Sequence, residues 1–250
     1  MNGATIYRGN SRINGKGVEV KVSGLFKGSG NVKTGKGPQV AILPIGGRAV
    51  VALRDGNDES VCGSCPLRAG PDGTGRLCYV NPMYVNTISK QDYPIADPND
   101  AVAVPIKGLL RIGSYGDPGA VPLNVYEPLI ERAEDGHTGY TRRWRELGPN
   151  APERAYLMAS VFTEAEAREA WALGWRTFRP MRSDETPIEG EIVCPHVTHG
   201  TTCADCRLCD GKNGADDARK SIANPIHGAR NQANLDAKFR EIQDLVQIAG

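Results

Sequence analysis

The sequence predicts an α/β protein: a partial or irregular (β/α) barrel with an N-terminal β-rich basic segment and a C-terminal cysteine-rich metal loop. Short β-prone runs alternate with helical patterns in the second half of the chain, as in βαβ units. Residues 1–45 show no helical period, and seven cysteines fall into two groups. The expected domains are residues 1–48 and residues 49–250. A doubly wound parallel sheet is the alternative arrangement.

The N-terminal segment is expected to be β-rich and basic. Residues 17–24 and 38–47 are predicted strands, separated by Gly/Lys turns. Residues 1–54 carry nine basic side chains against one acidic residue, Glu19. Such a segment either contacts nucleic acid or forms a solvated hairpin arm. The basic residues are Arg8, Arg12, Lys16, Lys21, Lys27, Lys33, Lys36, Arg48 and Arg54.

The rest of the chain alternates between predicted strands and helices. Residues 163–174 are expected to form a helix, because Thr163 and Glu166 form a capping box and Gly174 suits the position after the last turn. Residues 234–250 have a helical apolar period. The expected strands are residues 49–56, 137–144, 155–161, 175–180, 190–195 and 221–225. Residues 108–119 are an apolar run that breaks into a Gly-rich turn, a helix is expected at 121–135, and a loop at 86–104.

Four cysteines towards the C-terminal end predict a metal site, and we call them the second cysteine group. A cytosolic chain keeps its thiols reduced, so clustered cysteines indicate metal ligands rather than disulfides. Four thiolates complete a zinc site or hold a [4Fe-4S] cluster, and the run C-x2-C-x2-C favours the cluster. His196 and His199 lie inside the loop as alternative ligands. The group consists of Cys194, Cys203, Cys206 and Cys209.

Three other cysteines, Cys62, Cys65 and Cys78, form the first cysteine group and flank a Gly/Pro-rich loop. Three thiolates leave one ligand of a tetrahedral site unassigned. A [4Fe-4S] cluster on three cysteines keeps one iron open for a small molecule such as S-adenosylmethionine. The alternatives are zinc with a distant fourth ligand such as His227, zinc with an open position that activates water, or no metal at all.

The Gly-rich turn at the end of the apolar run 108–119 is a candidate cofactor-binding element, because its glycines let a ligand approach the backbone. Asp117 is a candidate catalytic residue there, or the cap of the next helix. Tyr140 is the second candidate catalytic residue. The candidate cofactor-binding residues are Gly113, Ser114, Tyr115, Gly116 and Asp117. One edge of the sheet is expected to collect the residues that follow predicted strands, namely Cys62, Asp117, Tyr140, Ser160 and Cys194.

Residues 140–145 interleave basic and aromatic side chains. This pattern suits phosphate contact combined with base stacking, as in single-stranded nucleic-acid binding. The alternative is a solvated strand end with a tryptophan in the core. The candidate nucleic-acid-binding residues are Arg142, Arg143, Trp144 and Arg145.

The composition argues against a membrane protein. No apolar run approaches the roughly 18 residues that a membrane span requires. Residues 1–17 are polar and lack the apolar stretch of a secretory signal. We therefore expect a cytoplasmic protein with no membrane partner.

Several motifs between about residue 62 and residue 228 resemble a family of uncharacterised phage-encoded proteins. They are CGSCPLR…LCYVN, LLRIGSYGDP, GYTRRW, LMASVFTEAEA, CPHVTHGTTCADCRLC and NPIHG, and they include all seven cysteines. That family is more distantly similar to phage proteins that resemble radical S-adenosylmethionine enzymes. Those enzymes have a partial (β/α) barrel and three cysteines spaced C-x3-C-x2-C, whereas the first cysteine group has the spacing C-x2-C-x12-C.

The resemblance implies an iron–sulfur enzyme of phage origin that modifies a nucleobase or nucleotide in DNA in the host cytoplasm. It implies that the first cysteine group holds the cluster that binds S-adenosylmethionine, with the glycine-rich turn near the methionine moiety. The second cysteine group would hold an auxiliary [4Fe-4S] cluster. Two alternatives are a zinc-dependent DNA base-exchange enzyme with Asp117 as nucleophile, and a zinc-braced nucleic-acid-binding or host-inhibiting protein without catalysis.

Overall fold

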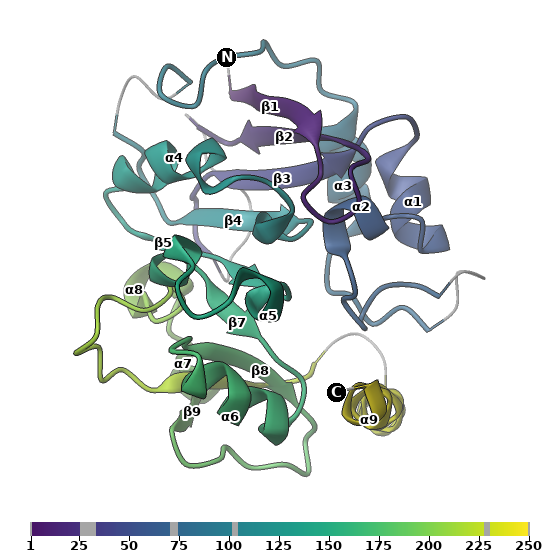
Figure 1. Cartoon of the computed structure of the whole chain (residues 1–250), viewed down its shortest axis with the longest axis vertical. Helices are drawn as coiled ribbons and strands as arrows, with labels where there is room; N and C mark the ends of the chain where they lie inside the picture. Colours follow the sequence, from purple (N-terminus) through teal and green to yellow (C-terminus); the bar gives the residue numbers. More distant parts are fainter. Residues whose placement is uncertain (1, 26–33, 71–74, 102–104, 228–230, 250) are drawn as a thin grey trace.

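The computed structural model describes residues 2–25, 34–70, 75–101, 105–227 and 231–249, and these form two five-stranded sheets (Figure 1). The first sheet contains, in spatial order, β1 (Gly3–Asn10), β2 (Gly17–Ser23), β3 (Gln39–Pro44), β4 (Leu110–Tyr115) and β5 (His137–Thr138). The second contains β6 (Tyr140–Thr141), β7 (Met158–Ser160), β8 (Thr177–Met181), β10 (Ser221–Pro225) and β9 (Glu191–Val193).

The direction of the strands changes along the first sheet. β1, β2 and β3 are antiparallel, whereas β3, β4 and β5 are parallel. Every pairing in the second sheet is parallel. The alternation of Val18, Val20 and Val22, all fully buried, explains why β2 forms a strand with one face on the core. The predicted strands at 17–24 and 38–47 are therefore confirmed.

A single residue, Gly139, separates β5 from β6 and joins the two sheets. Its carbonyl accepts a hydrogen bond from the Met158 amide (3.0 Å), and its own amide donates to the Cys209 carbonyl (3.2 Å). A Cβ atom at this position would lie 2.4 Å from Leu157 Cδ2. A larger residue here would therefore force the buried Leu157 side chain to move.

The α/β class is confirmed, but the predicted barrel is not found in the described residues. The sheets are open, with β1 at one edge and β9 at another. The antiparallel pairing of β1, β2 and β3 explains this, because these strands extend the sheet outwards. They also belong to the same sheet as β4 and β5, so a domain boundary after residue 48 does not coincide with a break in the sheet.

The predicted strand at 49–56 is instead the helix α1, which is a correction. Ala49, Val50 and Leu53 are buried on one helical face, and Gly56 ends the helix with φ 70°. A short apolar run does not distinguish a strand from a buried helix by its period alone. The described helices are α1 (Ala49–Asp55), α2 (Glu59–Cys62), α3 (Pro82–Ser89), α4 (Glu127–Glu131), α5 (Trp144–Leu147), α6 (Glu164–Ala172), α7 (Pro195–His199), α8 (Cys203–Cys206) and α9 (Gln232–Ala249), with 3-10 turns at Pro118–Ala120, Leu123–Val125 and Pro152–Ala155.

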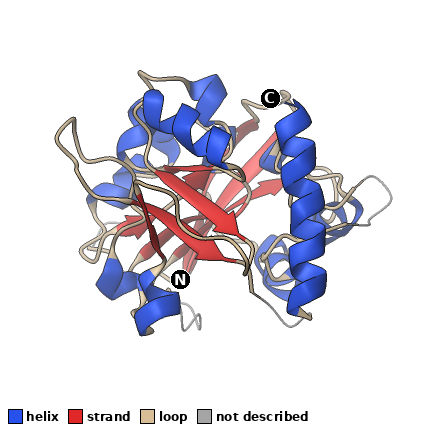
Figure 2. Cartoon of the chain, turned by 90° about the horizontal axis from the view of Figure 1, so that it is seen from below, coloured by secondary structure: helices blue, strands red, loops and turns tan. Residues whose placement is uncertain are grey.

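The helices α6 and α9 agree with the sequence prediction. Thr163 accepts a hydrogen bond from the Glu166 amide (3.1 Å) at the start of α6. In Figure 2, α9 is the long helix that lies beside the sheets. Its buried residues Leu235, Phe239 and Ile242 pack with Phe162 and Ile226. Across the described residues, no helix combines the length and the apolar character that crossing a membrane requires.

Candidate metal centres

The two cysteine groups form two separate sites. The Cys62 thiol interacts electrostatically with Cys65 and Cys78, whereas the Cys209 thiol interacts with members of its own group. The helices that carry them, α2 and α8, lie on opposite sides of the molecule in Figure 1. The expected gathering at one edge is therefore only partial, since Cys194 and Tyr140 belong to the second site.

The first cysteine group is assembled by a loop that folds back on itself. Cys62 is the last residue of α2, and the Cys65 amide donates to its carbonyl (3.2 Å). Further along, the amides of Leu77 and Cys78 both donate to the Leu67 carbonyl, at 3.1 and 2.9 Å. The fold-back brings the third cysteine to the other two, as the Gly/Pro-rich loop suggested.

A buried carboxylate holds this loop against the first sheet. Asp58, 1% exposed, accepts from Arg68 Nε at Oδ1 (2.7 Å) and from the Tyr115 hydroxyl at Oδ2 (3.2 Å). Arg68 also donates to the carbonyls of Gly56 (2.5 Å) and Gly63 (2.6 Å). Sequence reasoning missed Asp58 and Arg68; their nearness to the C-x2-C turn was the only signal available.

The first site lies where β4 and β6 end. The Asp117 amide, just after β4, donates to the Val61 carbonyl (2.6 Å). A hollow of about 490 Å³ opens beside Cys65, between the cysteine loop and residues Lys238 and Ile242 of α9. The carboxyl ends of parallel strands are the usual place for a ligand.

His227, the candidate distant fourth ligand, lies beside Tyr79, the residue that follows Cys78. Its ring Nδ1 bonds the Pro225 carbonyl (2.9 Å), and its amide donates to the Tyr79 hydroxyl (3.0 Å). The rings of Tyr79 and His227 lie 5.6 Å apart. The interaction joins the loop after β10 to the residue that follows Cys78.

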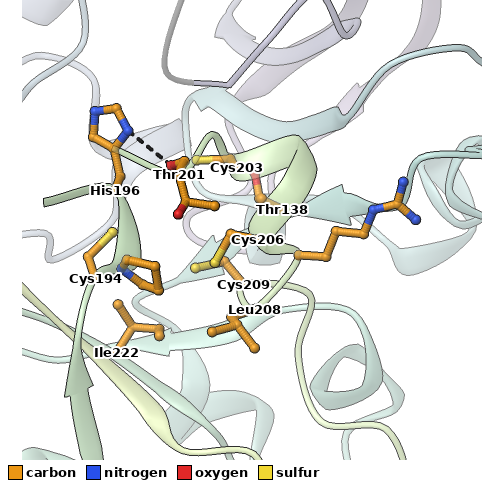
Figure 3. A pocket seen from close by; sticks show the side chains of 11 residues that line it. Thr138, Cys194, His196, Thr201, Cys203, Cys206, Leu208, Cys209 and Ile222 are labelled. Carbon is orange, nitrogen blue, oxygen red and sulfur yellow. Dashed lines mark hydrogen bonds between the residues drawn. The ribbon is translucent and has the colours of Figure 1, made fainter. Parts of the chain in front are cut away.

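The second cysteine group lines one small pocket against the second sheet (Figure 3). Cys194 follows β9 and donates its amide to the Ala223 carbonyl (2.8 Å). Ile222, on β10, forms the apolar wall of the pocket. His196 also lines it, but its Nδ1 is bonded to the Thr201 carbonyl (3.1 Å).

Hydrogen-bond donors point at sulfur atoms in both sites. In the first, the Leu67 amide donates to Cys65 and the Val80 amide to Cys78. In the second, the Leu208 amide donates to Cys206, and the Tyr140 hydroxyl donates to Cys209. A thiol is only a weak acceptor, so donors aimed at sulfur favour its anionic form. These donors to sulfur are part of both sites, and the sequence alone does not reveal them.

Burial nevertheless raises the pKa of five thiols, those of Cys62, Cys65, Cys78, Cys206 and Cys209, although these residues keep some exposed surface. It raises the pKa of Cys65 and of Cys209 to about 12, and that of Cys62 well above its usual range. In the metal-free protein these thiols are therefore neutral at pH 7. Binding a metal would release protons from them.

We expect the metal-free protein to lose stability as the pH rises above about 9. The unfolded chain loses thiol protons near the ordinary pKa of 9.0, whereas Cys65 and Cys209 keep theirs up to about 12. Above that pH the folded state binds more protons than the unfolded state, so the free energy of unfolding falls as the pH rises. Below the ordinary pKa this contribution of the thiols to stability is fully present. Urea unfolding at several pH values measures this. A Cys65→Ser/Cys209→Ser variant with an unchanged slope would contradict it.

No three His, Cys, Asp or Glu side chains are placed to hold a single metal ion within the described ranges. One zinc ion at about 2.3 Å from each sulfur needs its sulfurs about 3.8 Å apart. The four cysteines of the second group line one pocket, and among the described residues they are not placed around a single ion.

Asp117 is a hydrogen-bonded cap rather than a free carboxylate. Its Oδ1 accepts from the Gly119 amide (2.8 Å), its Oδ2 accepts from the Arg142 amide (2.6 Å), and the Thr141 hydroxyl donates as well. It is 8% exposed, and burial raises its pKa despite these donors. These contacts give a nucleophilic role no support, and the capping alternative describes the residue.

The candidate cofactor-binding turn packs against protein. Ser114 donates to the Val40 carbonyl (3.0 Å) and lies 2.8 Å from the Tyr84 hydroxyl. Tyr115 is bonded to Asp58, as described. A Cβ atom on Gly116 (φ 80°) would lie 2.7 Å from the Ile42 carbonyl oxygen, and one on Gly113 would lie 2.8 Å from the Gly116 carbonyl oxygen. Gly116 thus makes room for the neighbouring strand β3, and Gly113 makes room for the turn itself.

The basic and aromatic residues after β6 are mostly buried or paired with other groups of the protein. Trp144 is fully buried and so is unavailable for base stacking, which corrects the sequence-based expectation. Arg142 is paired with Glu166. Arg143 donates to the Gly119 carbonyl (2.8 Å). Arg145, partly exposed, is paired with Glu166 and Glu169 and lies over the Trp144 ring.

Some basic side chains of the N-terminal segment are also paired with other groups of the protein. Arg12 pairs with Glu153 (2.8 Å), and Lys21, 4% exposed, donates to the carbonyls of Ser89 and Gln91. Lys27 and Lys33 lie outside the described residues. The described contacts therefore give no separate support for a nucleic-acid surface here.

The chain matches no protein family model, no curated protein and no solved structure. Its function is therefore inferred from its own residues.

Proposed function

We propose that the protein is an iron–sulfur enzyme with two [4Fe-4S] clusters. The second cysteine group supplies four ligands and closes its cluster. The first cysteine group supplies three, which leaves one iron for the small molecule on which the enzyme acts. S-adenosylmethionine is the first ligand to test, and a nucleobase or nucleotide in DNA is the substrate class that the sequence resemblance implies.

The observation that supports this proposal most is the set of hydrogen bonds to sulfur in both groups. Amides two residues after Cys65, Cys78 and Cys206 donate to those sulfurs. Hydrogen bonds to cysteine sulfurs are one of the means by which proteins stabilise iron–sulfur clusters and set their potentials. Isolated buried thiols do not need such donors.

The C-x2-C-x2-C run of the second group supports a cluster over a single ion. Each cysteine of a [4Fe-4S] cluster binds a different iron at a corner of the cube, so the sulfurs stand farther apart than around zinc. When bound, the cluster would supply one-electron chemistry. The chain itself would bind it and, through Leu208 and Tyr140, donate hydrogen bonds to its ligands.

At the first site, the protein supplies a fixed scaffold and an adjoining hollow. Asp58 and Arg68 fix the turn that carries Cys62 and Cys65. The hollow of about 490 Å³ beside Cys65 falls in the range of small-molecule sites, roughly 300–1,000 Å³. A ligand seated there would lie next to the three-cysteine group.

The test is the content of iron, sulfide and zinc in protein purified without oxygen, with a visible spectrum of the same sample. Two clusters correspond to about eight irons and about eight sulfides per chain. Loaded protein is then incubated with S-adenosylmethionine and a reductant, and 5′-deoxyadenosine is measured. Zinc without iron contradicts the iron–sulfur proposal, whereas a full cluster load without 5′-deoxyadenosine removes only S-adenosylmethionine as the ligand.

A further inference from the structure

We infer that Tyr140 donates a hydrogen bond to the cluster ligand Cys209 and thereby raises the reduction potential of the cluster on the second cysteine group. The inference rests on the proposed iron–sulfur function. It gives Tyr140 a different role from that of a catalytic residue at the edge of the sheet. Tyr140 is a positioning residue that acts through Cys209.

Backbone contacts fix Tyr140 in relation to Cys209. The amide of the preceding residue, Gly139, donates to the Cys209 carbonyl (3.2 Å), so the cysteine loop is paired with the strand at this point. Tyr140 itself pairs with Met158 in the parallel ladder between β6 and β7. The residue before Tyr140 is thus bonded to Cys209, and Tyr140 itself is held in the sheet by its pairing with Met158.

Side-chain packing then directs the phenol towards the sulfur. The Tyr140 ring lies 4.6 Å from the Phe178 ring at an interplanar angle of 51°. It belongs to the same apolar cluster as Ile222 and Cys209. The hydroxyl donates to the Cys209 sulfur. A tyrosine hydroxyl is normally protonated at neutral pH, so it is a permanent donor.

A donor to a cluster sulfur has a predictable electrostatic effect. Reduction adds one electron to the cluster and breaks no bond, so negative charge on the iron, sulfide and cysteine sulfurs increases. A hydrogen-bond donor stabilises the more negative state, which raises the potential. The amide donor from Leu208 to Cys206 has the same effect, but it belongs to the backbone, so a change of side chain other than to proline keeps it. Tyr140 is the donor that a side-chain change eliminates.

The test is a redox titration of wild-type and Tyr140→Phe protein, both reconstituted with iron and sulfide. Dithionite supplies the electrons, and electron paramagnetic resonance follows each cluster. Repeating the titration in Cys65→Ser protein assigns the signal of the second site. We expect unchanged iron content and a lower potential for that cluster in Tyr140→Phe.

Tyr156→Phe is the matched control, because it removes a hydroxyl that donates to Glu127 (3.0 Å) rather than to sulfur. Its potential should equal that of the wild type. Fluorotyrosine at position 140 keeps the shape and is a stronger donor, so it should move the potential the other way. This variant decides the question if Tyr140→Phe fails to fold.

Equal potentials at equal cluster content would overturn this inference and leave the proposed function intact. A wild-type protein that binds no iron at the second site would overturn the proposed function, and the inference with it. The two failures are therefore distinguished by the iron analysis made before the titration.

Discussion

Replacing Cys65 with serine is expected to remove about four of about eight irons and leave the second cluster in place. Cys65 belongs to the three-cysteine site, which has no spare thiolate among the described residues. Cys206→Ser should remove the other four irons, because its sulfur lies in the separate pocket. Iron and sulfide analysis of the two variants, with visible spectra, measures both effects.

The control is Ser64→Ala, a neighbour of Cys65 that lines the same hollow. It should keep the full iron content of the wild type. Loss of all iron in either cysteine variant would mean that the two groups share one cluster. That result would contradict the separation of the sites.

The sequence predicted the membership of both cysteine groups but not what surrounds them. The spacing C-x2-C-x2-C is a local signal. The contact between Asp58 and Tyr115 spans 57 positions, and it forms only when β4 is in place beside the cysteine loop. No local pattern contains such a contact, so Asp58 was missed.

The fold shows the same difference between local signals, which the sequence contains, and contacts between distant segments, which it does not. The strand β2 was predicted because alternating valines are a local signal of a half-buried strand. The run that forms α1 has no clear alternation, and its conformation is set by its packing beside α3. The number of strands in each sheet depends on pairings between distant segments, such as β3 with β4. This is why an open arrangement was not distinguished from a barrel.

Replacing Glu191 with glutamine is expected to destabilise the protein by about 3–5 kcal/mol, because it leaves a buried arginine without its counter-ion. Glu191 Oε1 accepts from Arg179 Nε (3.0 Å), and Oε2 accepts from Arg179 Nη2 (2.7 Å). Both side chains are at most 3% exposed. The free energy of unfolding in urea measures the change. The effect bears on the second site because β9 leads directly into Cys194.

The matched control is Glu164→Gln, which breaks the ion pair of Glu164 with Arg168. Both side chains are more than half exposed, so the cost should be about 0.3–0.5 kcal/mol. A Glu191→Gln protein as stable as this control would show that Arg179 is satisfied without Glu191. Its remaining contact with Glu185, at 3.8 Å, would then be the explanation to examine.

The single glycine between β5 and β6 has a consequence for measurements in solution. The Gly139 amide is bonded to Cys209, a residue of the second site, and not to a neighbouring strand. Its exchange with deuterated solvent therefore reports the opening of the cysteine loop, whereas the Met158 amide, bonded to Gly139, reports the opening of the sheet. Comparing the two amides with and without metal separates local release of the loop from unfolding of the β-structure. One residue thus serves as a built-in probe of occupancy at the second site.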